Sequence, residues 1–355
     1  MSILTLILFI FILSLIVLVH ELGHFFWAKK FGVHIYEFSI GMGPAIYTKT
    51  GKDNINYSFR AIPIGGFVAM AGEVYEDGDE ELPKDKYLCN KLWWQRIIVM
   101  AAGVVNNFIL AIILIFISTF CFKTEEVTLK LDSVIEGSAV EKAGIVAGDK
   151  IIAVNGKDVS YANEFQIRLL FAQDKKSQEF TILHKDGTTD DYKIVPKEVK
   201  DENGNKVSYG FGFYLEEIDT FKEKIVYSFR TFINTFDTMN LTIYGLFTGK
   251  VGLGDLSGPV GIYEFVGDSV SSDVSFSKNV ANVIYLIWLL SINVGYINIL
   301  PFPAFDGGRI LFILIEKLKG SPVNQKFENV CHAVGFILIL LLIVVVTISD
   351  ILKLL

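Results

Sequence analysis

The stretch VLVHELGHFFWAKK, residues 17–30, places two histidines and a glutamate near the end of a long apolar run. His20 and His24 are four residues apart, so on a helix they lie one turn apart on the same face, next to Glu21. In this H-E-x-x-H pattern two imidazoles can bind one Zn²⁺ while the glutamate accepts a proton from water. An acidic group at the centre of a membrane helix costs roughly 2.5–3.5 kcal/mol, and a bound metal would offset that cost.

The chain as a whole is unusually apolar for a protein with this many charges. Its 355 residues are 52% hydrophobic and 20% charged, with a mean hydropathy of +0.46, which indicates that both membrane and water surround it. Long apolar runs cover residues 2–27, 97–122, 280–300 and 330–348. Each run is close to the roughly 20 residues that cross a bilayer as a helix, so we expect about four transmembrane helices.

The first run is expected to remain in the mature chain. A cleaved signal peptide is the alternative, but no Lys or Arg precedes the run and no small-residue cleavage pattern follows it. Basic residues flank the spans on one side, and these are Lys29, Lys30, Lys91, Arg96, Arg309, Lys317, Lys319 and Lys326. Because cytoplasmic loops carry an excess of Lys and Arg, we expect these loops to face the cytoplasm.

Charge and cysteine content give no support for a nucleic-acid-binding protein or for a fold held by disulfides. The net charge of −7 gives no indication of nucleic-acid binding. The three cysteines, Cys89, Cys121 and Cys331, fall in an inner loop or at span ends, so no disulfide framework is expected. They also lack the spacing of a zinc-binding cluster.

A third metal ligand is expected because catalytic zinc sites usually have three protein ligands plus water. The segment NILPFPAFDGG, residues 298–308, ends the third span on the same side as the histidines, so Asp306 can reach them. Its two prolines break the helix and allow the chain to turn. Taken alone, Asp306 before two glycines is more often a turn residue. Asn298 is either a polar helix end or an amide that hydrogen-bonds substrate or an oxyanion.

A hairpin is expected around residues 55–73, since NYSFRAIPIGGFVAMAGE contains two short apolar runs around Pro63–Gly66. A plain surface hairpin and a membrane-associated hairpin that offers an edge strand to an extended substrate both fit the residues.

The region from about Glu126 to Lys200 reads as a small α/β domain. Ser138 and Glu141 form a capping box before a short helix that stops at Gly144, and Asn155-Gly156 and Asp186-Gly187 are turn signals. Residues 206–279 are harder to assign. An amphipathic pattern near residues 224–247 fits an interfacial helix or a core helix against the α/β domain, and we favour the interfacial one.

These motifs, in this order, closely resemble the site-2 protease family of intramembrane zinc metalloproteases, in the bacterial branch similar to the regulator of sigma-E protease, with a single PDZ domain. The resemblance covers nearly the whole chain, through HELGH (20–24), GMGP (41–44), RAIPIGGFVAMAGE (60–73), EGSAVEKAGIVAGDKIIAVNGKDV (136–159), LSGPVGI (256–262) and NILPFPAFDGG (298–308). One small departure is Phe305, where the family commonly has Leu.

The resemblance implies a set of site residues and one cofactor. Zn²⁺ would be bound by His20, His24 and Asp306, with Glu21 as catalytic acid and base. Asn298 would bind substrate, as would the hairpin residues Gly65, Gly66 and Phe67.

The fold expected is a polytopic α-helical membrane protein with about four transmembrane helices, a membrane-associated β-hairpin and one extracytoplasmic α/β PDZ domain. Its expected parts are residues 1–124 (two spans and the hairpin), 125–205 (PDZ domain), 206–279 (connector) and 280–355 (two spans). Similarity to the family implies a multi-pass protein of the inner (plasma) membrane, with the active site toward the cytoplasm.

The expected function is hydrolysis of peptide bonds within transmembrane segments of single-pass proteins. By resemblance, these substrates would already be shortened by another protease, as anti-sigma factors or remnant signal peptides are. Two alternatives remain. A zinc transporter predicts ligands spread along a path and repeated halves, and no repeat is visible. A PDZ adaptor with a silent site predicts loss of the site residues, which are intact.

Overall fold

The computed structural model describes residues 3–73, 82–122, 127–160, 162–170, 177–200, 206–270 and 275–354. The chain divides into two compact units, one formed by residues 1–118 and 239–355 and the other by residues 119–238. Each unit is described by itself below.

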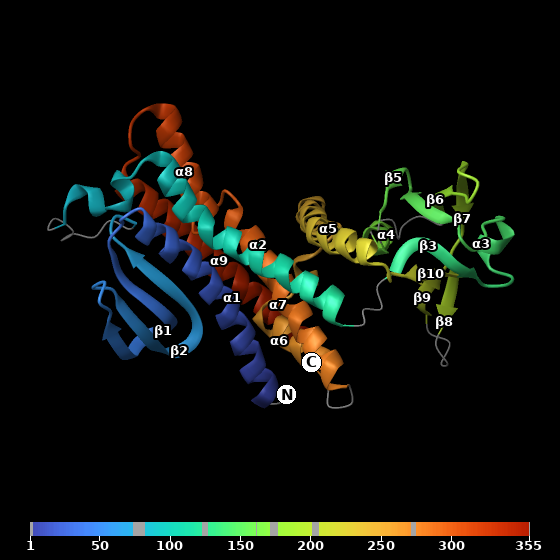
Figure 1. Ribbon diagram of the computed structural model, residues 1–355, viewed down its shortest axis with the longest axis horizontal. Coiled ribbons are helices and arrows are strands. Elements are labelled where there is room, and N and C mark those ends of the chain that lie inside the picture. The colour runs from blue at the N-terminus through green and yellow to red at the C-terminus, as the bar shows by residue number, and fades with distance from the viewer. Residues whose placement is uncertain are drawn as a thin grey trace. The chain divides into compact units, whose positions relative to one another are not determined.

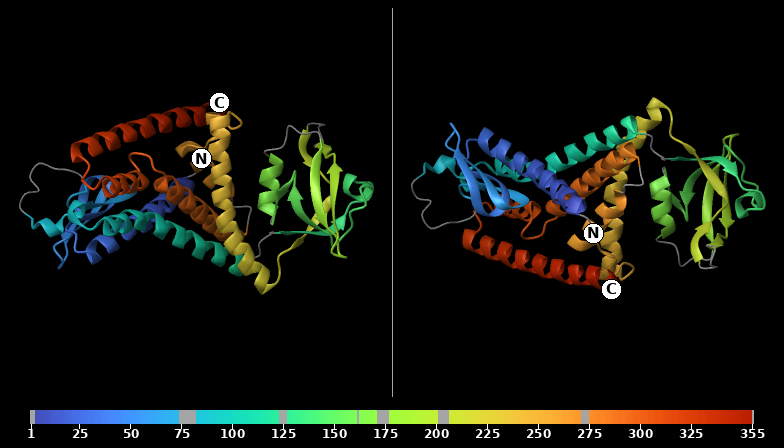
Figure 2. Two further views of the ribbon diagram at one scale, coloured as in Figure 1. Left: turned by 90° about the horizontal axis from the view of Figure 1, so that it is seen from above. Right: turned by 90° about the horizontal axis from the view of Figure 1, so that it is seen from below.

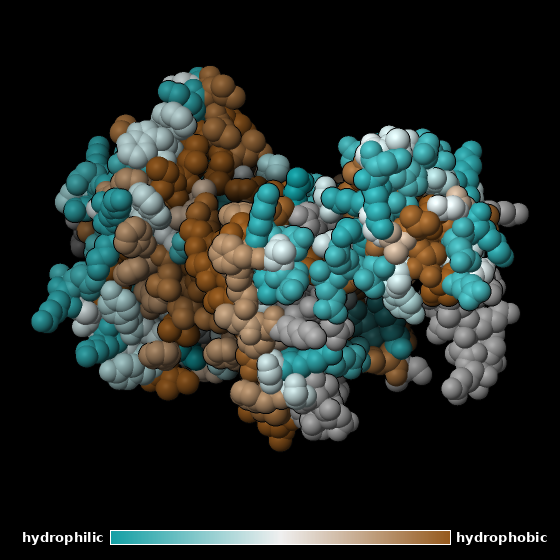
Figure 3. Space-filling model, turned by 45° about the vertical axis from the view of Figure 1, so that its right-hand side comes forward, coloured by the Kyte–Doolittle hydropathy of each residue, from teal (hydrophilic) through white to brown (hydrophobic). Residues whose placement is uncertain are grey.

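Long apolar helices dominate the first unit (Figure 1). Its helices are α1 (Ile3–Lys30), α2 (Trp93–Cys121), α6 (Pro259–Ser269), α7 (Phe276–Ile299), α8 (Asp306–Lys319) and α9 (Gln325–Leu354), with short 3₁₀ turns at Lys84–Lys86, Leu88–Asn90 and Leu253–Asp255. Within the described ranges four helices, α1, α2, α7 and α9, are long and apolar enough to cross a membrane, which agrees with the four expected spans. Figure 3 shows apolar side chains gathered over these helices.

Helices α1, α2 and α7 lie side by side, while α9 runs along one flank of the bundle (Figure 2). One buried cluster joins α1 to α6 and α7 and contains Ile12, Ile16, Val266, Leu286, Ile287 and Leu290. A second joins the end of α1 to the strands, α2 and α8, and includes Ala28, Phe38, Val68, Val99 and Ile313. These two clusters fix the helix that carries the histidines against its neighbours.

Glycine makes the closest helix crossing possible. A Cβ at Gly23 of α1 would lie 2.3 Å from the Ala102 carbonyl oxygen of α2. Small residues allow such close backbone approach between membrane helices, so Gly23 lets α1 and α2 cross with their backbones in contact.

The strands β1 (Ile35–Thr50) and β2 (Asn56–Met70) form a two-stranded antiparallel sheet against α1. Both strands are long and bent, so residues 37–40 pair with residues 66–69 on one side and with residues 56–59 on the other. The outer parts, residues 45–50 and 56–60, also pair with each other. Residues 62–70 of β2 pair on one side with β1, and no other described strand pairs with them.

The expected hairpin turn at Pro63–Gly66 is wrong. These residues lie inside β2, and the turn is at Gly51–Ile55, where the Gly51 N–H donates to the Ile55 carbonyl at 2.8 Å. Proline is tolerated in an edge strand when its missing N–H would point away from the sheet, where no strand accepts a hydrogen bond. The Pro63 carbonyl accepts a hydrogen bond from Ser14 Oγ of α1 at 2.5 Å. The hairpin is therefore larger than predicted and begins at Ile35.

The second unit contains an antiparallel sheet. Its elements are β3 (Val127–Val134), α3 (Ala139–Lys142), β4 (Lys150–Val154), β5 (Lys157–Asp158), α4 (Ala162–Leu170), β6 (Gln178–Leu183), β7 (Thr189–Ile194), β8 (Lys197–Lys200), β9 (Lys206–Gly210) and β10 (Phe213–Glu217). The main sheet has the order β10-β3-β4-β6-β7, with β5 beside β4, and β8 pairs with β9. Its core includes Leu129, Phe165, Phe180 and Ile182.

Local turn chemistry in this unit agrees with the sequence. Ser138 Oγ accepts the Glu141 N–H at 3.1 Å, and the Glu141 carboxylate accepts the Gly137 N–H at 2.6 Å. Asn155 and Gly156 have φ of 49° and 71° in the turn between β4 and β5, and Gly187 has φ of 88° between β6 and β7. Positive φ favours Asn and Gly in such hairpin turns, so these signals are confirmed.

Strand pairing in this unit extends beyond residue 205. Residues 125 and 205 lie outside the described residues, but β10 pairs with β3, so the sheet continues to Glu217. Residues 213–217 therefore belong to the main sheet, and residues 206–210 pair with β8 in a separate two-stranded sheet. Helix α5 (Phe221–Thr248) then leads back to the first unit. Local sequence patterns did not predict β10, because its pairing partner β3 lies about 80 positions earlier in the chain and such patterns do not report distant pairing.

The motif SGPVGI, although rich in Gly and Pro, begins helix α6. Pro259 occupies the first helical position, where its missing N–H costs nothing. The buried carboxylate of Asp350 in α9 accepts the N–H groups of Gly258 and Gly261 at 2.8 and 2.9 Å. A charged acceptor supplied by another helix thus satisfies this helix start.

Candidate metal centre and active site

Three side chains from two distant helices converge on one point. His20 Nε2 and His24 Nε2 of α1 lie 3.1 Å apart. Oδ2 of Asp306, the first residue of α8, lies 3.0 Å from His20 Nε2 and 3.4 Å from His24 Nε2. Both histidines are buried. Within the described chain these three residues form the one His, Cys, Asp and Glu group close enough to share a metal ion.

The spacing of these donor atoms fits a tetrahedral zinc site. Zinc bonds of about 2.0–2.2 Å at tetrahedral angles separate the donor atoms by about 3.3–3.6 Å, close to the 3.0–3.4 Å observed. Asp306 Oδ2 is buried and accepts no hydrogen bond of ordinary geometry from the described residues. Buried polar atoms are normally satisfied, so this orphaned oxygen fits a metal ligand.

Glycine on α2 leaves room beside the imidazoles. A Cβ at Gly103 would lie 2.5 Å from His24 Nε2 and 2.7 Å from His20 Nε2, closer than real Cβ atoms approach. The space next to both donor nitrogens therefore exists only because residue 103 has no side chain.

The other ring nitrogens of the histidines contact α2. His24 Nδ1 lies 2.8 Å from the Val99 carbonyl oxygen, so it carries the proton and leaves Nε2 free to bind a metal. His20 Nδ1 lies 3.4 Å from Asn107 Nδ2, while Asn107 Oδ1 is buried without a hydrogen-bond partner in the described chain. Reversing this amide places its oxygen at His20 Nδ1–H, which satisfies both groups and frees Nε2.

Two adjacent asparagines of α2 tie three helices together at this level. Asn106 Nδ2 donates to the Val19 carbonyl of α1 at 3.1 Å, and the Asn107 carbonyl accepts a hydrogen bond from Ser291 Oγ of α7 at 2.9 Å. We did not single out Gly103, Asn106 or Asn107 in the sequence. Asn106 and Asn107 could have been identified, because two adjacent amide side chains inside an apolar span indicate a buried polar site.

The loop between α7 and α8 sets the position of Asp306. The residues Asp-Gly-Gly form the first turn of α8 rather than a free turn. Cβ atoms at Gly307 and Gly308 would lie 2.2 and 2.4 Å from the Ile299 and Phe302 carbonyl oxygens, so both glycines allow the helix to start against the loop. Ala304 has φ of 92°, a region that costs a non-glycine residue of order 1–3 kcal/mol.

Glu21 faces the sheet next to the histidines. A Cβ at Gly66 of β2 would lie 3.9 Å from Glu21 Cγ and 2.6 Å from the Ser39 carbonyl oxygen of β1. Gly65, with φ of 82°, precedes it, and the ring of Phe67 packs under the Arg60 guanidinium at 4.9 Å. The edge part of β2 therefore passes directly beside Glu21.

Asn298 lies in the last turn of α7 and is half-buried. No hydrogen bond joins it to His20, His24 or Asp306 in the described residues. Its expected role toward substrate therefore stays a prediction.

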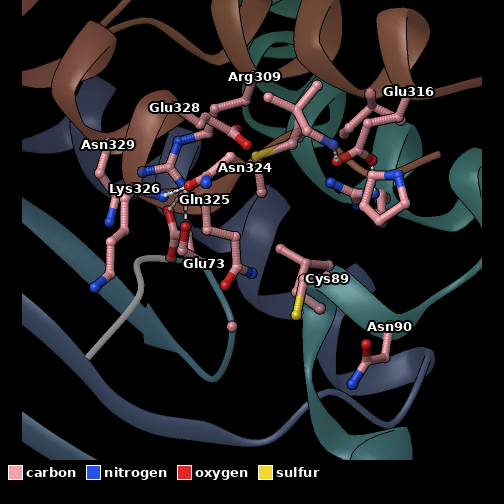
Figure 4. Close-up of a pocket in the computed structure, with 17 residues that line it drawn as sticks. Glu73, Cys89, Asn90, Arg309, Glu316, Asn324, Gln325, Lys326, Glu328 and Asn329 are labelled. Atoms are coloured by element: carbon pink, nitrogen blue, oxygen red, sulfur yellow. Dashed lines mark hydrogen bonds and ion pairs between the residues drawn. The ribbon is translucent and has the colours of Figure 1, made fainter. Parts of the chain in front are cut away.

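A cavity of about 620 Å³, lined largely by polar and charged residues, lies between the segment after β2, the start of α2 and the helices α8 and α9 (Figure 4). None of the three clustered side chains lines it, but Arg309, one turn after Asp306, does. Arg309 Nη1 lies 2.8 Å from Glu73 Oε1, which ties the start of α8 to the segment after β2. Arg96 and Glu316 form a second ion pair in its wall.

The comparisons with known proteins agree with this geometry. The chain is 37% identical to FN1322 of Fusobacterium nucleatum, whose name provisionally describes a zinc metalloprotease, over 96% of this chain and 97% of that protein. It is 31% identical to the zinc metalloprotease RasP of Shouchella clausii, over 99% of both chains. The sequence profile of Peptidase family M50 matches residues 8–342.

The range matched by the profile, residues 8–342, spans the positions of His20, Glu21, His24 and Asp306 and nearly all of both units. The family expected from the sequence motifs is therefore confirmed. This chain belongs to peptidase family M50, the family of the site-2 proteases.

Proposed function

We propose that this chain is a zinc metalloprotease that hydrolyses peptide bonds within, or at the edge of, transmembrane segments of single-pass membrane proteins. The observation that carries this proposal is the cluster of His20, His24 and Asp306 beside Glu21, formed by two apolar parts of the chain. Ionisable groups in membrane helices are costly and mark functional sites, and family membership gives the reaction class.

In this proposal each residue of the cluster has a chemical role. His20, His24 and Asp306 would hold Zn²⁺. When bound, the ion would supply Lewis-acid polarisation of the peptide carbonyl and would lower the pKa of water. Glu21 takes a proton from the attacking water and passes it to the leaving amine. Asn298 donates a hydrogen bond to substrate or to the developing oxyanion.

The open edge of β2 supports an extended substrate. A transmembrane helix hides its peptide bonds within its own hydrogen bonds, so it must unwind before cleavage. Residues 62–70 of β2 offer main-chain groups that no other described strand pairs, and Gly66 lies next to Glu21. A substrate strand added at this edge, including Gly65, Gly66 and Phe67, would hold a peptide bond beside the catalytic glutamate.

The polar cavity supports supply of water from one side. Arg309 and Glu73 connect its wall to the start of α8 and the end of the β2 segment. Lys29, Lys30 and the basic residues between α7 and α9 lie toward the same ends of the spans, which we assign to the cytoplasm. The protein is then a multi-pass protein of the plasma membrane with its active site facing inward.

The second unit would act outside the cytoplasm. Its sheet carries the sequence that resembles a PDZ domain, and such domains bind extended peptides at a sheet edge. We assign it the selection of substrates already shortened by another protease, such as anti-sigma factors or remnant signal peptides. Cleavage would then release a cytoplasmic fragment.

Purified full-length protein and a model single-pass substrate in detergent micelles test the proposal. Wild-type protein should cut the substrate, and a chelator should stop the reaction. Glu21→Gln should bind zinc as the wild type does but lose cleavage, because the amide cannot accept the proton of water. Continued cleavage by Glu21→Gln would refute the assigned role. Metal transport by that variant in vesicles would favour a transporter, and absence of cleavage by the wild type would favour an adaptor.

A further inference from the structure

The loop that carries Asp306 holds a conformation that its own sequence does not favour. Ala304, two residues before Asp306, has φ of 92°, whereas residues other than glycine rarely adopt positive φ values in this region. Such a residue keeps its conformation only when surrounding contacts fix it. Contacts from another part of the chain are therefore needed.

One such contact comes from His332 of α9. The Ala304 N–H donates to His332 Nδ1 at 2.9 Å. Since Nδ1 accepts this bond, a neutral ring carries its proton on Nε2, which is buried and has no hydrogen-bond partner in the described chain. The ring also packs against Phe312 of α8, with centroids 5.6 Å apart. His332 thus contacts both the loop and the helix that follows it.

A second contact comes from Gly335, three residues further along α9. A Cβ there would lie 2.2 Å from the Pro303 carbonyl oxygen and 2.7 Å from its carbonyl carbon. The α9 backbone therefore packs directly against the residue that precedes Ala304. Together, His332 and Gly335 hold both sides of the Pro303–Ala304 peptide bond.

We propose that His332 is a positioning residue for the metal centre, acting on Asp306 through the strained backbone of Ala304. This inference rests on the proposed coordination of zinc by His20, His24 and Asp306. If the Ala304 backbone relaxed, Asp306 would lose its place 3.0 and 3.4 Å from the two donor nitrogens. The last membrane helix, which supplies no ligand, would then determine how firmly the metal is held.

Two substitutions of His332 separate its hydrogen bond from its bulk. His332→Leu removes the acceptor and leaves the Ala304 N–H unpaired. His332→Asn keeps an acceptor, because Asn Oδ1 takes nearly the position of His Nδ1. Ala304→Gly removes the cost of the positive φ, since glycine adopts it without steric conflict. The double variant Ala304→Gly/His332→Leu still leaves the N–H of residue 304 unpaired, so it is expected to recover part of what His332→Leu loses.

The experiment measures zinc loss from full-length protein in detergent. Zinc-loaded variants are mixed with a chromogenic chelator, the half-time of zinc release is recorded, and thermal unfolding is followed in parallel. His332→Leu should shorten the half-time by about 10–100-fold, as loss of groups that orient metal ligands does. His332→Asn should release zinc at a rate close to that of the wild type, and the double variant should release it more slowly than His332→Leu. If His332→Leu does not fold, the other two variants still carry the test.

Asp306→Ala is measured alongside, so that two kinds of failure are distinguished. Retention of zinc by Asp306→Ala would refute the proposed coordination. If Asp306→Ala loses zinc but His332→Leu releases it as slowly as the wild type, only the positioning role is refuted. Rapid release from His332→Asn, or release from the double variant as fast as from His332→Leu, would also overturn the inference, because the first variant keeps the acceptor and the second removes the strain at residue 304.

Discussion

Adding one methyl group to α2 should disable the metal centre. In Gly103→Ala the new Cβ would lie 2.5 Å from His24 Nε2 and 2.7 Å from His20 Nε2. Real Cβ contacts stay beyond 3.0 Å, so at least one imidazole or the α2 backbone must move by about 0.5 Å. Movement of α2 away from α1 would also open the close backbone crossing at Gly23, where a Cβ would lie 2.3 Å from the Ala102 oxygen.

The size of the effect follows from this overlap. Inserting a methyl group into a packed interior costs typically about 1–3 kcal/mol, although alanine favours a helix over glycine by about 1 kcal/mol. Stability should therefore fall by at most about 2 kcal/mol. Zinc affinity should fall by about 10–100-fold, because the displaced atoms are the donor nitrogens themselves. The assay measures zinc content by atomic emission after dialysis, thermal unfolding, and cleavage of a model substrate.

The matched control is Gly267→Ala in α6, a helical glycine whose Cβ would meet its nearest atom, a Thr5 methyl group, at 3.3 Å. This variant should retain zinc and activity. Gly103→Ala protein that binds zinc and cuts substrate as well as Gly267→Ala would refute the argument that the two donor nitrogens need this empty space.

Three further predictions concern the same centre. Asn107→Leu removes the amide at His20 Nδ1, so zinc release to a chelator should accelerate about 10–100-fold, and an unchanged rate would contradict the assigned contact. Gly335→Ala places a methyl group 2.2 Å from the Pro303 oxygen, so it should lower cleavage activity and zinc retention together, and normal zinc retention would contradict this. Removing zinc from wild-type protein should abolish cleavage reversibly and lower the unfolding temperature, and activity that persists without zinc would refute the metal requirement.

The sequence predicted the parts of the site that depend on local spacing or on membrane orientation. His20, Glu21 and His24 could be placed because an i, i+4 pair on a helix needs no tertiary information. Asp306 could be placed at the same membrane depth because the basic residues orient the spans. The four spans were likewise predictable from apolar length alone.

The features that were missed depend on contacts between distant segments. Gly103 matters only because α2 crosses α1 at the histidines, and no sequence pattern gives that crossing point. The hairpin was misplaced because Pro63 and the glycines at 65 and 66, which normally indicate a turn, here lie in a bent edge strand. Pairing of β10 with β3 and capping of α6 by Asp350 also join segments far apart in the chain.

The capping of α6 by Asp350 has a consequence for biosynthesis. The acceptor for Gly258 and Gly261 lies about 90 residues after them in the chain. While the ribosome is still adding α9, the start of α6 lacks this buried partner and must remain hydrated or loosely packed. Docking of α6 thus has to wait for the synthesis of residue 350, and a nascent chain arrested before that residue should still expose this segment to a protease.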